Sequence, residues 1–388
     1  MWRNLASNFL TIVIVAMIAV AVAIGWAQRQ YVAQGPLDEA ICLQVPRGGS
    51  MSRVADDLAS KGAITNPTIY RLGADYADKT SQLKAGSFLI APGSSMAEIV
   101  DEITGDGRST CGTQVVYLVG VGGQELRVRV LDTDSQEFET VAEFDPAAED
   151  VEVPEEYASV IDEPGTELTV SIAEGVTSWQ VVNALNAWDM FEGEVAEIPA
   201  EGTLAPDRYE IRPGQDRQAF LDNMMAIQER RLAEAWENRS PSTVVETPEE
   251  ALILASIIEK ETALAEERGL VASVFTNRLR QGIRLQTDPT VIYGVTEGKG
   301  VLGRGLRQSE LRRETPWNTY VIEGLPPTPI ANPGLASIEA ALNPEESEYV
   351  FFVAKTLDPK DGHNFAVTLD EHNRNVAAYR ALERAANE

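Results

Sequence analysis

The chain has 388 residues and a formal net charge of −28, and it contains two cysteines and two histidines. That length provides for two or three domains and a sizeable core. The strong negative charge argues against nucleic acid, whose phosphates it would repel, and against electrostatic docking onto anionic lipid. His363 and His372 belong to no Cys/His cluster with metal-ligand spacing, so we expect no metal and no cofactor.

An uncharged apolar run over residues 9–26 comes first along the chain. Its length lies at the lower end for a helix that spans a bilayer, and Trp2 and Trp26 stand where interfacial anchors would lie. We predict a cytoplasmic stub and transmembrane anchor within residues 1–30, with the remainder exported. A cleaved signal peptide is the alternative, because Ala21-Val22-Ala23 resembles a cleavage site of small residues.

Two segments share one plan, which predicts two small α+β modules. Residues 40–106 read as a strand, a turn, capped helices and a strand that meets Pro92-Gly93. Residues 167–245 repeat that plan and reach Pro213-Gly214 at the corresponding point. The first module resembles a LysM-type glycan-binding module in its strand-helix-helix-strand order.

A β-rich and acidic insertion is predicted between the modules, over residues 107–166. Alternating runs at 114–119 and 126–131 predict strands, and the glycines from Gly120 to Gly123 predict a hairpin turn between them. The acidic, proline-containing stretch 143–163 is typical of a solvated linker.

The two cysteines are Cys42, at the start of the first module, and Cys111, in the insertion. In an oxidising compartment they would pair. Two free thiols fit the sequence equally well, so the sequence leaves the pairing open.

The segment most informative about function is a helix predicted after Thr247, which ends in Glu259-Lys260-Glu261. Thr247 followed by Pro248 is a helix-start signal, and an apolar run comes next. On a period of 3.6 residues, Glu261 shares the apolar face, whereas Glu259 falls on its flank. A carboxyl group on a buried face resists ionising, so its pKa rises and it can act as a general acid near neutral pH. The competing interpretation is a helix end whose glutamates face solvent.

A dense set of polar and aromatic residues follows this helix, and residues 349–353 predict a buried strand whose partner begins at His363. Such polar groups form hydrogen bonds with sugar hydroxyls and N-acetyl groups, and aromatic faces pack on pyranose rings. Taken singly, each residue is better explained as a cap or a surface group, but their density favours a polymer-binding cleft. The candidate supporting or substrate-binding residues are Glu259, Asn277, Gln286, Thr287, Asp288, Tyr293, Asn318, Tyr320, His363 and Phe365.

Six motifs in this region resemble the endolytic murein transglycosylase, or YceG-like, family. They are ASIIEKET at 255–262, VASVFTNRL at 271–279, RLQTDPTVIYG at 284–294, NTY at 318–320, GLPP at 324–327 and NPG at 332–334. The resemblance implies an α+β fold whose mixed α+β catalytic domain occupies residues 246–388. Residues 108–165 depart from the family pattern.

The resemblance implies cleavage of the β-1,4 bond between N-acetylmuramic acid and N-acetylglucosamine within the glycan strands of peptidoglycan, with formation of a 1,6-anhydro ring. The catalytic glutamate of the family corresponds to Glu261, which would act first as acid and then as base. The resemblance also implies a single-pass inner-membrane protein with its catalytic domain in the periplasm. There it would terminate new strands in association with peptidoglycan synthases.

Two alternatives stay open. A glycoside hydrolase would use Glu261 as the acid and Asp288 or Glu259 to activate water, because hydrolases normally need a second carboxylate. A non-catalytic glycan-binding scaffold of the cell-elongation machinery would leave the glutamate pair with a structural role only. The mass of the released products separates these interpretations.

Overall fold

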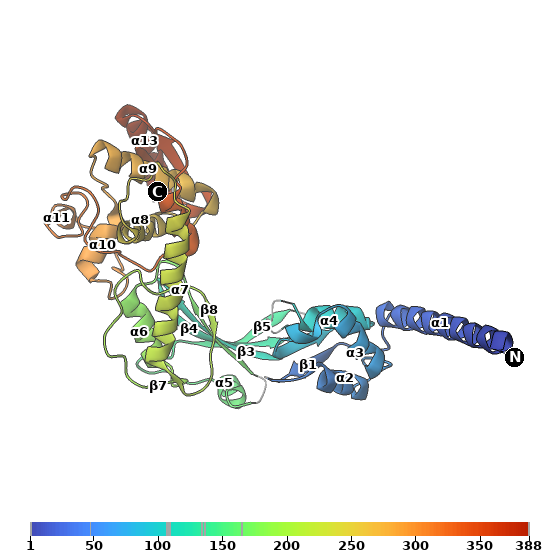
Figure 1. Ribbon diagram of the computed structural model, residues 1–388. Helices are drawn as coiled ribbons and strands as arrows, with labels where there is room; N and C mark the ends of the chain where they lie inside the picture. The colour runs from blue at the N-terminus through green and yellow to red at the C-terminus, as the bar shows by residue number, and fades with distance from the viewer. Residues whose placement is uncertain are drawn as a thin grey trace. The chain divides into compact units, whose positions relative to one another are not determined.

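Figure 1 shows the computed structural model, which describes residues 2–46, 48–105, 110–132, 135, 137–163 and 166–386. The chain is a mixed α+β protein with an N-terminal apolar helix, as predicted. It divides into two compact units. The first comprises Met1–Val115, Arg127–Glu143 and Val153–Glu167, and the second comprises Val116–Leu126, Phe144–Glu152 and Leu168–Glu388.

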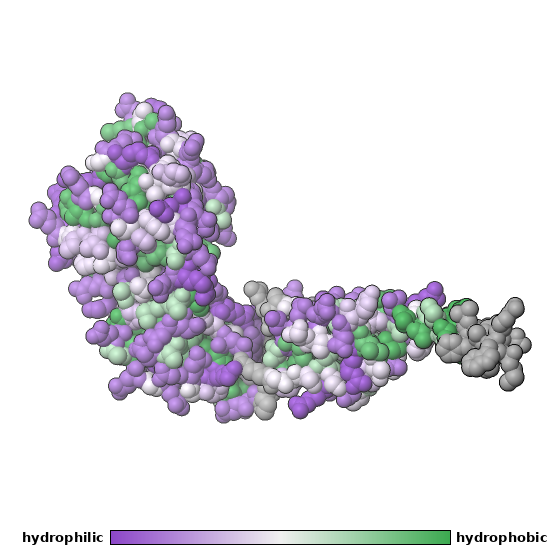
Figure 2. Space-filling model, viewed as in Figure 1, coloured by the Kyte–Doolittle hydropathy of each residue, from purple (hydrophilic) through white to green (hydrophobic). Residues whose placement is uncertain are grey.

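The N-terminal helix α1 covers Trp2–Val32. Within it, Ile12–Val32 has a mean hydropathy of 2.0, and among the described residues it is the one segment long and apolar enough to cross a membrane. Figure 2 shows apolar residues along the described part of this helix. Near its end, Ala27 and Tyr31 pack against the core of the following module. Anchors and signal sequences share this length and composition, so both alternatives fit the helix.

The first module is a two-stranded antiparallel sheet packed against helices. Its elements are β1 (Ile41–Val45), α2 (Met51–Ser60), α3 (Pro67–Tyr76), η1 (Thr80–Gln82), β2 (Gly86–Ile90) and α4 (Met96–Ile103). Leu43 of β1 pairs with Phe88 of β2, and both side chains lie in the core. Ser50, Asn66 and Ser95 cap α2, α3 and α4 by accepting hydrogen bonds from backbone N–H groups of the first turn. The predicted strand-helix-helix-strand order is therefore present.

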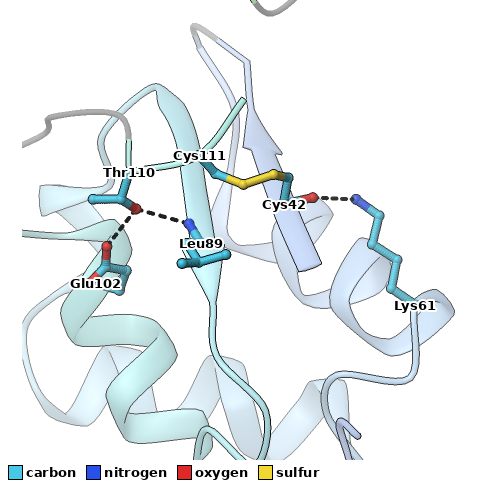
Figure 3. Close-up of a disulfide and its surroundings, with 6 residues drawn as sticks. All are labelled: Cys42, Lys61, Leu89, Glu102, Thr110 and Cys111. Carbon is cyan, nitrogen blue, oxygen red and sulfur yellow. Dashed lines mark hydrogen bonds between the residues drawn. A yellow bond between two sulfur atoms is a disulfide. The ribbon is translucent and has the colours of Figure 1, made fainter. Parts of the chain in front are cut away.

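A disulfide joins Cys42 to Cys111, whose Cα atoms are 5.6 Å apart (Figure 3). It links β1 to the segment by which the chain leaves the first module. Beside it, Thr110 donates a hydrogen bond to Glu102 Oε1 and accepts one from the backbone N–H of Leu89, each at 2.9 Å. The pairing that the sequence left open is thus present in the structure.

A five-stranded sheet follows, with the strand order β5-β4-β3-β6-β8. Its strands are β3 (Thr113–Gly120), β4 (Gly123–Leu131), β5 (Phe138–Phe144), β6 (Glu167–Ile172) and β8 (Arg208–Glu210). The hairpin predicted between the first two of these strands is present. The stretch predicted as a linker, residues 143–163, contains a short helix, α5 (Glu155–Val160), which its proline-rich acidic composition did not indicate.

The strand-helix plan of the first module recurs after β6. The strand leads into α6 (Ser178–Ala187) and pairs antiparallel with β8, as β1 does with β2. The short parallel pair of β7 (Phe191–Glu192) and β9 (Gln215–Asp216) then leads into α7 (Arg217–Glu237). Edge-to-face aromatic contacts fill the interior, including Tyr117 with Trp188 and Phe191 with Phe220, both at 5.2 Å between centroids.

The C-terminal part packs the apolar helix α8 against α9 and α12. The elements are α8 (Pro248–Glu261), η2 (Ala265–Glu267), α9 (Arg268–Gln281), α10 (Asp288–Thr296), α11 (Gln308–Leu311), α12 (Leu335–Leu342), β10 (Phe351–Ala354), η3 (Pro359–Asp361), β11 (His363–Ala366) and α13 (Leu369–Ala386). The helix α9 ends at Gly282, which has the left-handed φ of +68° that glycine adopts freely. Phe352 of β10 pairs with Phe365 of β11, so the predicted strand and its partner are present. The strand was expected to be buried, but every residue of β10 is only partly buried.

Asn332 connects the C-terminal helices to the segment that precedes them. This asparagine is fully buried, and its side chain donates to the carbonyl of Val176 and accepts from the N–H of Leu204, each at 3.0 Å. Its backbone also exchanges hydrogen bonds of 2.9 Å with Gly175 and Val176. These hydrogen bonds lie within the second compact unit, which includes Leu168–Glu388.

Candidate active site

Glu261 is the last residue of α8. Thr247 caps the start of the helix, and every residue from Ala251 to Ile258 is buried, so the helix passes through the core. The chain turns extended at Thr262, whose hydroxyl accepts a hydrogen bond from Leu264 N–H at 3.1 Å. Glu261 therefore lies at the end of α8, just beyond the part of the helix that is buried in the apolar core.

The carboxyl group of Glu261 is held by protein on most sides, although the residue retains some accessible surface. Thr287 donates its hydroxyl hydrogen to Oε1 of Glu261. Burial raises the pKa of Glu261 to about 7; the Thr287 hydrogen bond and the charge of Arg278 oppose this rise, and the charge of Asp288 adds to it. The direction of this shift is the one expected from the helix phase, although the residue is half-buried rather than fully buried.

Thr287 is itself fixed by two other threonines. Its backbone N–H donates to Thr319 Oγ1 at 3.1 Å, and its carbonyl accepts from Thr290 Oγ1 at 2.8 Å. The preceding residue, Gln286, has a left-handed φ of +50° and an exposed side chain, and its N–H donates to the carbonyl of Thr319 at 3.2 Å. This turn directs the Thr287 hydroxyl toward the Glu261 carboxyl and leaves the Gln286 side chain exposed to solvent.

Asp288 and Tyr320 form a second polar pair in the same region. The phenol of Tyr320 donates to Asp288 Oδ1 at 2.6 Å, and burial together with the charge of Asp288 raises the pKa of Tyr320 well above its ordinary value. The charge of Glu261 contributes to the same shift in the pKa of Tyr320. The side chains of Glu261 and Asp288 therefore both lie close enough to Tyr320 to interact with it electrostatically. Four of the predicted site residues, Glu261, Thr287, Asp288 and Tyr320, are therefore brought together.

Arg278 was not among the predicted site residues, yet its charge acts on Glu261. It is 8 % exposed and donates to three backbone carbonyls, those of Val350 (2.6 Å), Leu285 (2.7 Å) and Arg284 (3.2 Å). It thereby holds the segment before Thr287 against the segment that enters β10. A signal was present in the sequence, because Arg278 lies on the apolar phase of its helix, seven residues after Val271.

Glu259 faces a different partner from Glu261. Its Oε2 accepts the backbone N–H of Gly334 at 3.0 Å, at the N-terminus of α12, where a negative charge is favourable. Glu174 lies against the same glycine, and partial burial together with the charge of Glu259 raises the pKa of Glu174. Lys260 donates to the carbonyl of Gly175 at 3.1 Å. The residues on the N-terminal side of Glu261 therefore anchor the end of α8 to its neighbours, and sequence reasoning did not identify Glu174.

Three further candidates have their polar groups engaged by backbone or by other side chains. The amide of Asn277 donates to the carbonyls of Ser347 and Tyr349, each at 2.9 Å. Asn318 is fully buried and donates to three carbonyls, the shortest contact being 2.7 Å to Arg313. Tyr293 donates to Glu201 Oε2 at 3.3 Å. These contacts order the loops around the site and leave those amides little capacity for a ligand.

His363 and Phe365 lie on the β10–β11 hairpin. The Nδ1 of His363 lies 2.8 Å from Glu267 Oε2, and its backbone N–H donates to the same carboxylate. Although burial acts to raise it, the pKa of Glu267 is held below its ordinary value by these hydrogen bonds. The ring of Phe365 packs 5.5 Å from that of Tyr349, and both rings are partly exposed.

The arrangement can give and take a proton with one side chain. A carboxyl with a pKa near 7 is populated in both states at neutral pH, and a positioned hydroxyl and a phenol–carboxylate pair lie near it. Within the part of the chain that the structure describes, no group of three His, Cys, Asp or Glu residues is placed to hold a metal ion. The fold is a mixed α+β fold, and its candidate site contains a carboxyl group that could give and take a proton near neutral pH.

The YceG-like family model matches residues 148–378, and the chain belongs to that family, which confirms the resemblance of the motifs. The endolytic murein transglycosylase of Bacillus subtilis (strain 168) is 28 % identical over 341 residues, which cover 87 % of this chain and 84 % of that protein. The protein of the same name from Streptococcus pneumoniae serotype 2 (strain D39) is 26 % identical over 372 residues. This match covers 92 % of the chain but 62 % of the pneumococcal protein. A crystal structure of a YceG-like protein from Listeria monocytogenes has 25 % identity and a TM-score of 0.46, covering 87 % of this chain and 98 % of that one.

Proposed function

We propose that this protein is a membrane-anchored lytic transglycosylase that cleaves the β-1,4 bond between N-acetylmuramic acid and N-acetylglucosamine within peptidoglycan strands. The observation that carries the proposal is the half-buried carboxyl of Glu261, with its pKa raised to about 7 and its hydrogen bond from Thr287. The curated relatives, named endolytic murein transglycosylases, support the same reaction class.

One carboxyl group suffices for the reaction. Protonated Glu261 gives its proton to the glycosidic oxygen as the bond from that oxygen to C1 of the muramyl residue breaks. The C6 hydroxyl oxygen of the same sugar then bonds to C1, and its proton passes to the Glu261 carboxylate. A 1,6-anhydro ring forms, no water is consumed, and the glutamate returns to its protonated state. A pKa near 7 suits a group that must act both as acid and as base at neutral pH.

The positions of the other carboxylates favour this route over hydrolysis. A hydrolase normally needs a second carboxylate, about 5 to 10 Å away, as nucleophile or water activator. Glu259 is occupied at the N-terminus of α12, and Asp288 accepts the hydrogen bond of Tyr320. The second candidate function is hydrolysis, with Glu261 as the acid and Asp288 as the second carboxylate. Asp288 is the candidate for that role because its charge acts on Glu261.

Two features of the N-terminal unit support the proposed location. The apolar segment Ile12–Val32 suits a single-pass anchor in the inner membrane. The Cys42–Cys111 disulfide favours an oxidising compartment such as the periplasm for the catalytic part. An anchored enzyme would act on strands close to the membrane, which agrees with a role in terminating nascent strands beside peptidoglycan synthases.

Substitution of Glu261 tests the proposal. We expect Glu261→Gln to lower the release of anhydro-ended products from uncrosslinked peptidoglycan by at least 10²-fold, without loss of folding or sacculus binding. The exposed neighbour Glu266 provides the matched control, and Glu266→Gln should retain wild-type activity. Full activity in Glu261→Gln would exclude the proposed catalyst. Wild-type products that carry one extra water would instead identify a hydrolase, and a wild-type protein that binds glycan without releasing products would be a scaffold.

A further inference from the structure

A groove of about 590 Å³ lies along α6, outside the surroundings of Glu261 described above. Its floor and one wall are formed by Trp179, Val182, Asn183 and Asn186 of α6, and its other wall by residues 193–198. Trp179, Asn183 and Asn186 follow one another at intervals of four and three residues, so they share one face of the helix. Trp179 is partly buried, whereas the two asparagines are exposed.

The polar groups on this face are unengaged. Among the described residues, the side-chain amides of Asn183 and Asn186 and the indole N–H of Trp179 make no hydrogen bond within the chain. Arg217 differs, because it donates to the carbonyls of Leu185 (3.0 Å) and Gly193 (2.6 Å) and thereby holds the two walls together. The groove is therefore braced by one residue and presents a tryptophan and two free amides.

This combination suits an N-acetylated sugar chain. Each amide provides two N–H donors and a carbonyl acceptor, which can pair with sugar hydroxyls and N-acetyl groups. The flat apolar face of a tryptophan packs on a pyranose ring. Glu194 and Glu197 on the facing wall are exposed, and the chain as a whole carries a charge of −28. An uncharged ligand is consequently favoured over an anionic one.

A short path through the fold relates the groove to the catalytic carboxyl. Thr287, which contacts Glu261, precedes α10. Just beyond the other end of α10, the carbonyl of Gly298 accepts the hydroxyl of Thr177 at 2.6 Å, and Thr177 caps α6 two residues before Trp179. The nine residues of α10 span about 14 Å, so α6 begins roughly the length of that short helix from the site. Both ends of this path lie within one compact unit.

We propose that the α6 groove is a distal subsite for the uncharged glycan backbone of peptidoglycan, which holds sugars several units away from the bond that Glu261 cleaves. This inference rests on the proposed function and extends it. A distal subsite contributes binding energy for long strands and none for short ones. The enzyme therefore binds long strands more tightly than short ones.

Binding measured against chain length tests the subsite. The full-length protein carries Glu261→Gln so that the ligand is not cut. The probes are peptide-free N-acetylglucosamine–N-acetylmuramic acid strands whose lactyl carboxyl groups are converted to amides, so that they carry no charge, and a tetrasaccharide of the same repeat treated in the same way. We expect the double variant Asn183→Ala, Asn186→Ala, and separately Trp179→Ala, to raise the Kd for long strands about tenfold. The Kd for the tetrasaccharide should stay unchanged. Trp179→Phe, which keeps an aromatic face, should retain most of the affinity for long strands.

The matched control is Asn373→Ala, which removes an exposed asparagine from α13 and should change neither Kd. Equal Kd values for long strands in the groove variants and in the parent would overturn the subsite, provided that their melting temperatures agree. A parallel titration uses strands that keep their stem peptides. Weaker binding of the groove variants confined to those strands would also overturn the subsite, in favour of a peptide site. The proposed function is judged separately, by whether the enzyme with Glu261 intact releases anhydro ends from the same strands.

Discussion

The hydroxyl of Thr287 donates a hydrogen bond to Oε1 of Glu261 and so joins the end of α8 to the start of α10. This hydrogen bond favours the carboxylate, whereas burial and the charge of Asp288 favour the protonated form. Burial outweighs the hydrogen bond, and the pKa of Glu261 is raised to about 7. The balance between these effects determines how the protein should respond to pH and to substitution.

The rate of the wild-type enzyme should decline on the alkaline side of pH 7. The first step needs a protonated Glu261, and above its pKa of about 7 the protonated fraction falls tenfold for each pH unit. Initial rates of anhydro-product release between pH 5 and pH 9 would measure the decline as kcat/KM. A profile that stays level up to pH 9 would show that no group with this pKa acts as the acid.

Thr287→Val should move that alkaline limb to higher pH. Valine has the shape of threonine without the hydroxyl, so the carboxylate loses a stabilising donor and its pKa rises further. We also expect the rate at the optimum to fall about fivefold, because the carboxyl loses one orienting hydrogen bond. The same pH series on the variant provides the measurement, and an unmoved limb would mean that the threonine does not act on the acid.

Glu261→Gln should stabilise the fold at alkaline pH and leave it unchanged in acid. The folded-state pKa of about 7 lies above the ordinary value of 4.5, so ionisation of Glu261 destabilises the folded state, in full above pH 7 and not at all below pH 4.5. The glutamine variant escapes this effect, and its gain should approach about 3 kcal/mol at pH 8. Denaturant unfolding at pH 4 and pH 8 would measure the gain, with Glu266→Gln as control. An equal effect at both pH values would contradict the raised pKa.

Glu259 should prove structural. Glu259→Ala leaves the N–H of Gly334 without its acceptor at the start of α12, and we expect a loss of about 1 to 2 kcal/mol of stability. Glu259→Gln keeps an acceptor oxygen, removes the repulsion of Glu174 and should retain substantial activity. Melting temperatures and product release should be measured on the same preparations. A folded Glu259→Gln protein as inactive as Glu261→Gln would assign a catalytic role to Glu259.

The local parts of the fold and the phase of the helix that ends at Glu261 could be predicted, because they depend on neighbouring residues. The helix start at Thr247 and the apolar run after it define a helix with a period of 3.6 residues. That period is enough to place Glu261 on the apolar face and Glu259 on its flank. Glycine at 282 and the alternation around the β3–β4 hairpin likewise act over a few residues. The roles of the polar candidates could not be predicted in this way. Nothing near Asn277 or Asn318 indicates that distant carbonyls occupy their amides.

The same limit applies to residues that the sequence left out. Glu174 and Gly334 are far apart along the chain and meet because the loop after β6 packs against the start of α12. The pairing of Cys42 with Cys111 likewise depends on the path that the chain takes through the first module. Arg278 is the exception, since a charged residue on an apolar helix face is visible in the sequence and indicates buried partners.

The most direct test of the chemistry is to digest uncrosslinked peptidoglycan with the full-length enzyme in water enriched in oxygen-18. Intramolecular attack by the C6 hydroxyl uses no water, so we predict anhydro-ended products with no heavy oxygen, and none of these products from Glu261→Gln. Reducing ends that carry oxygen-18 at C1 would mean that water, not the C6 hydroxyl, attacks the sugar, and would contradict the transglycosylase mechanism.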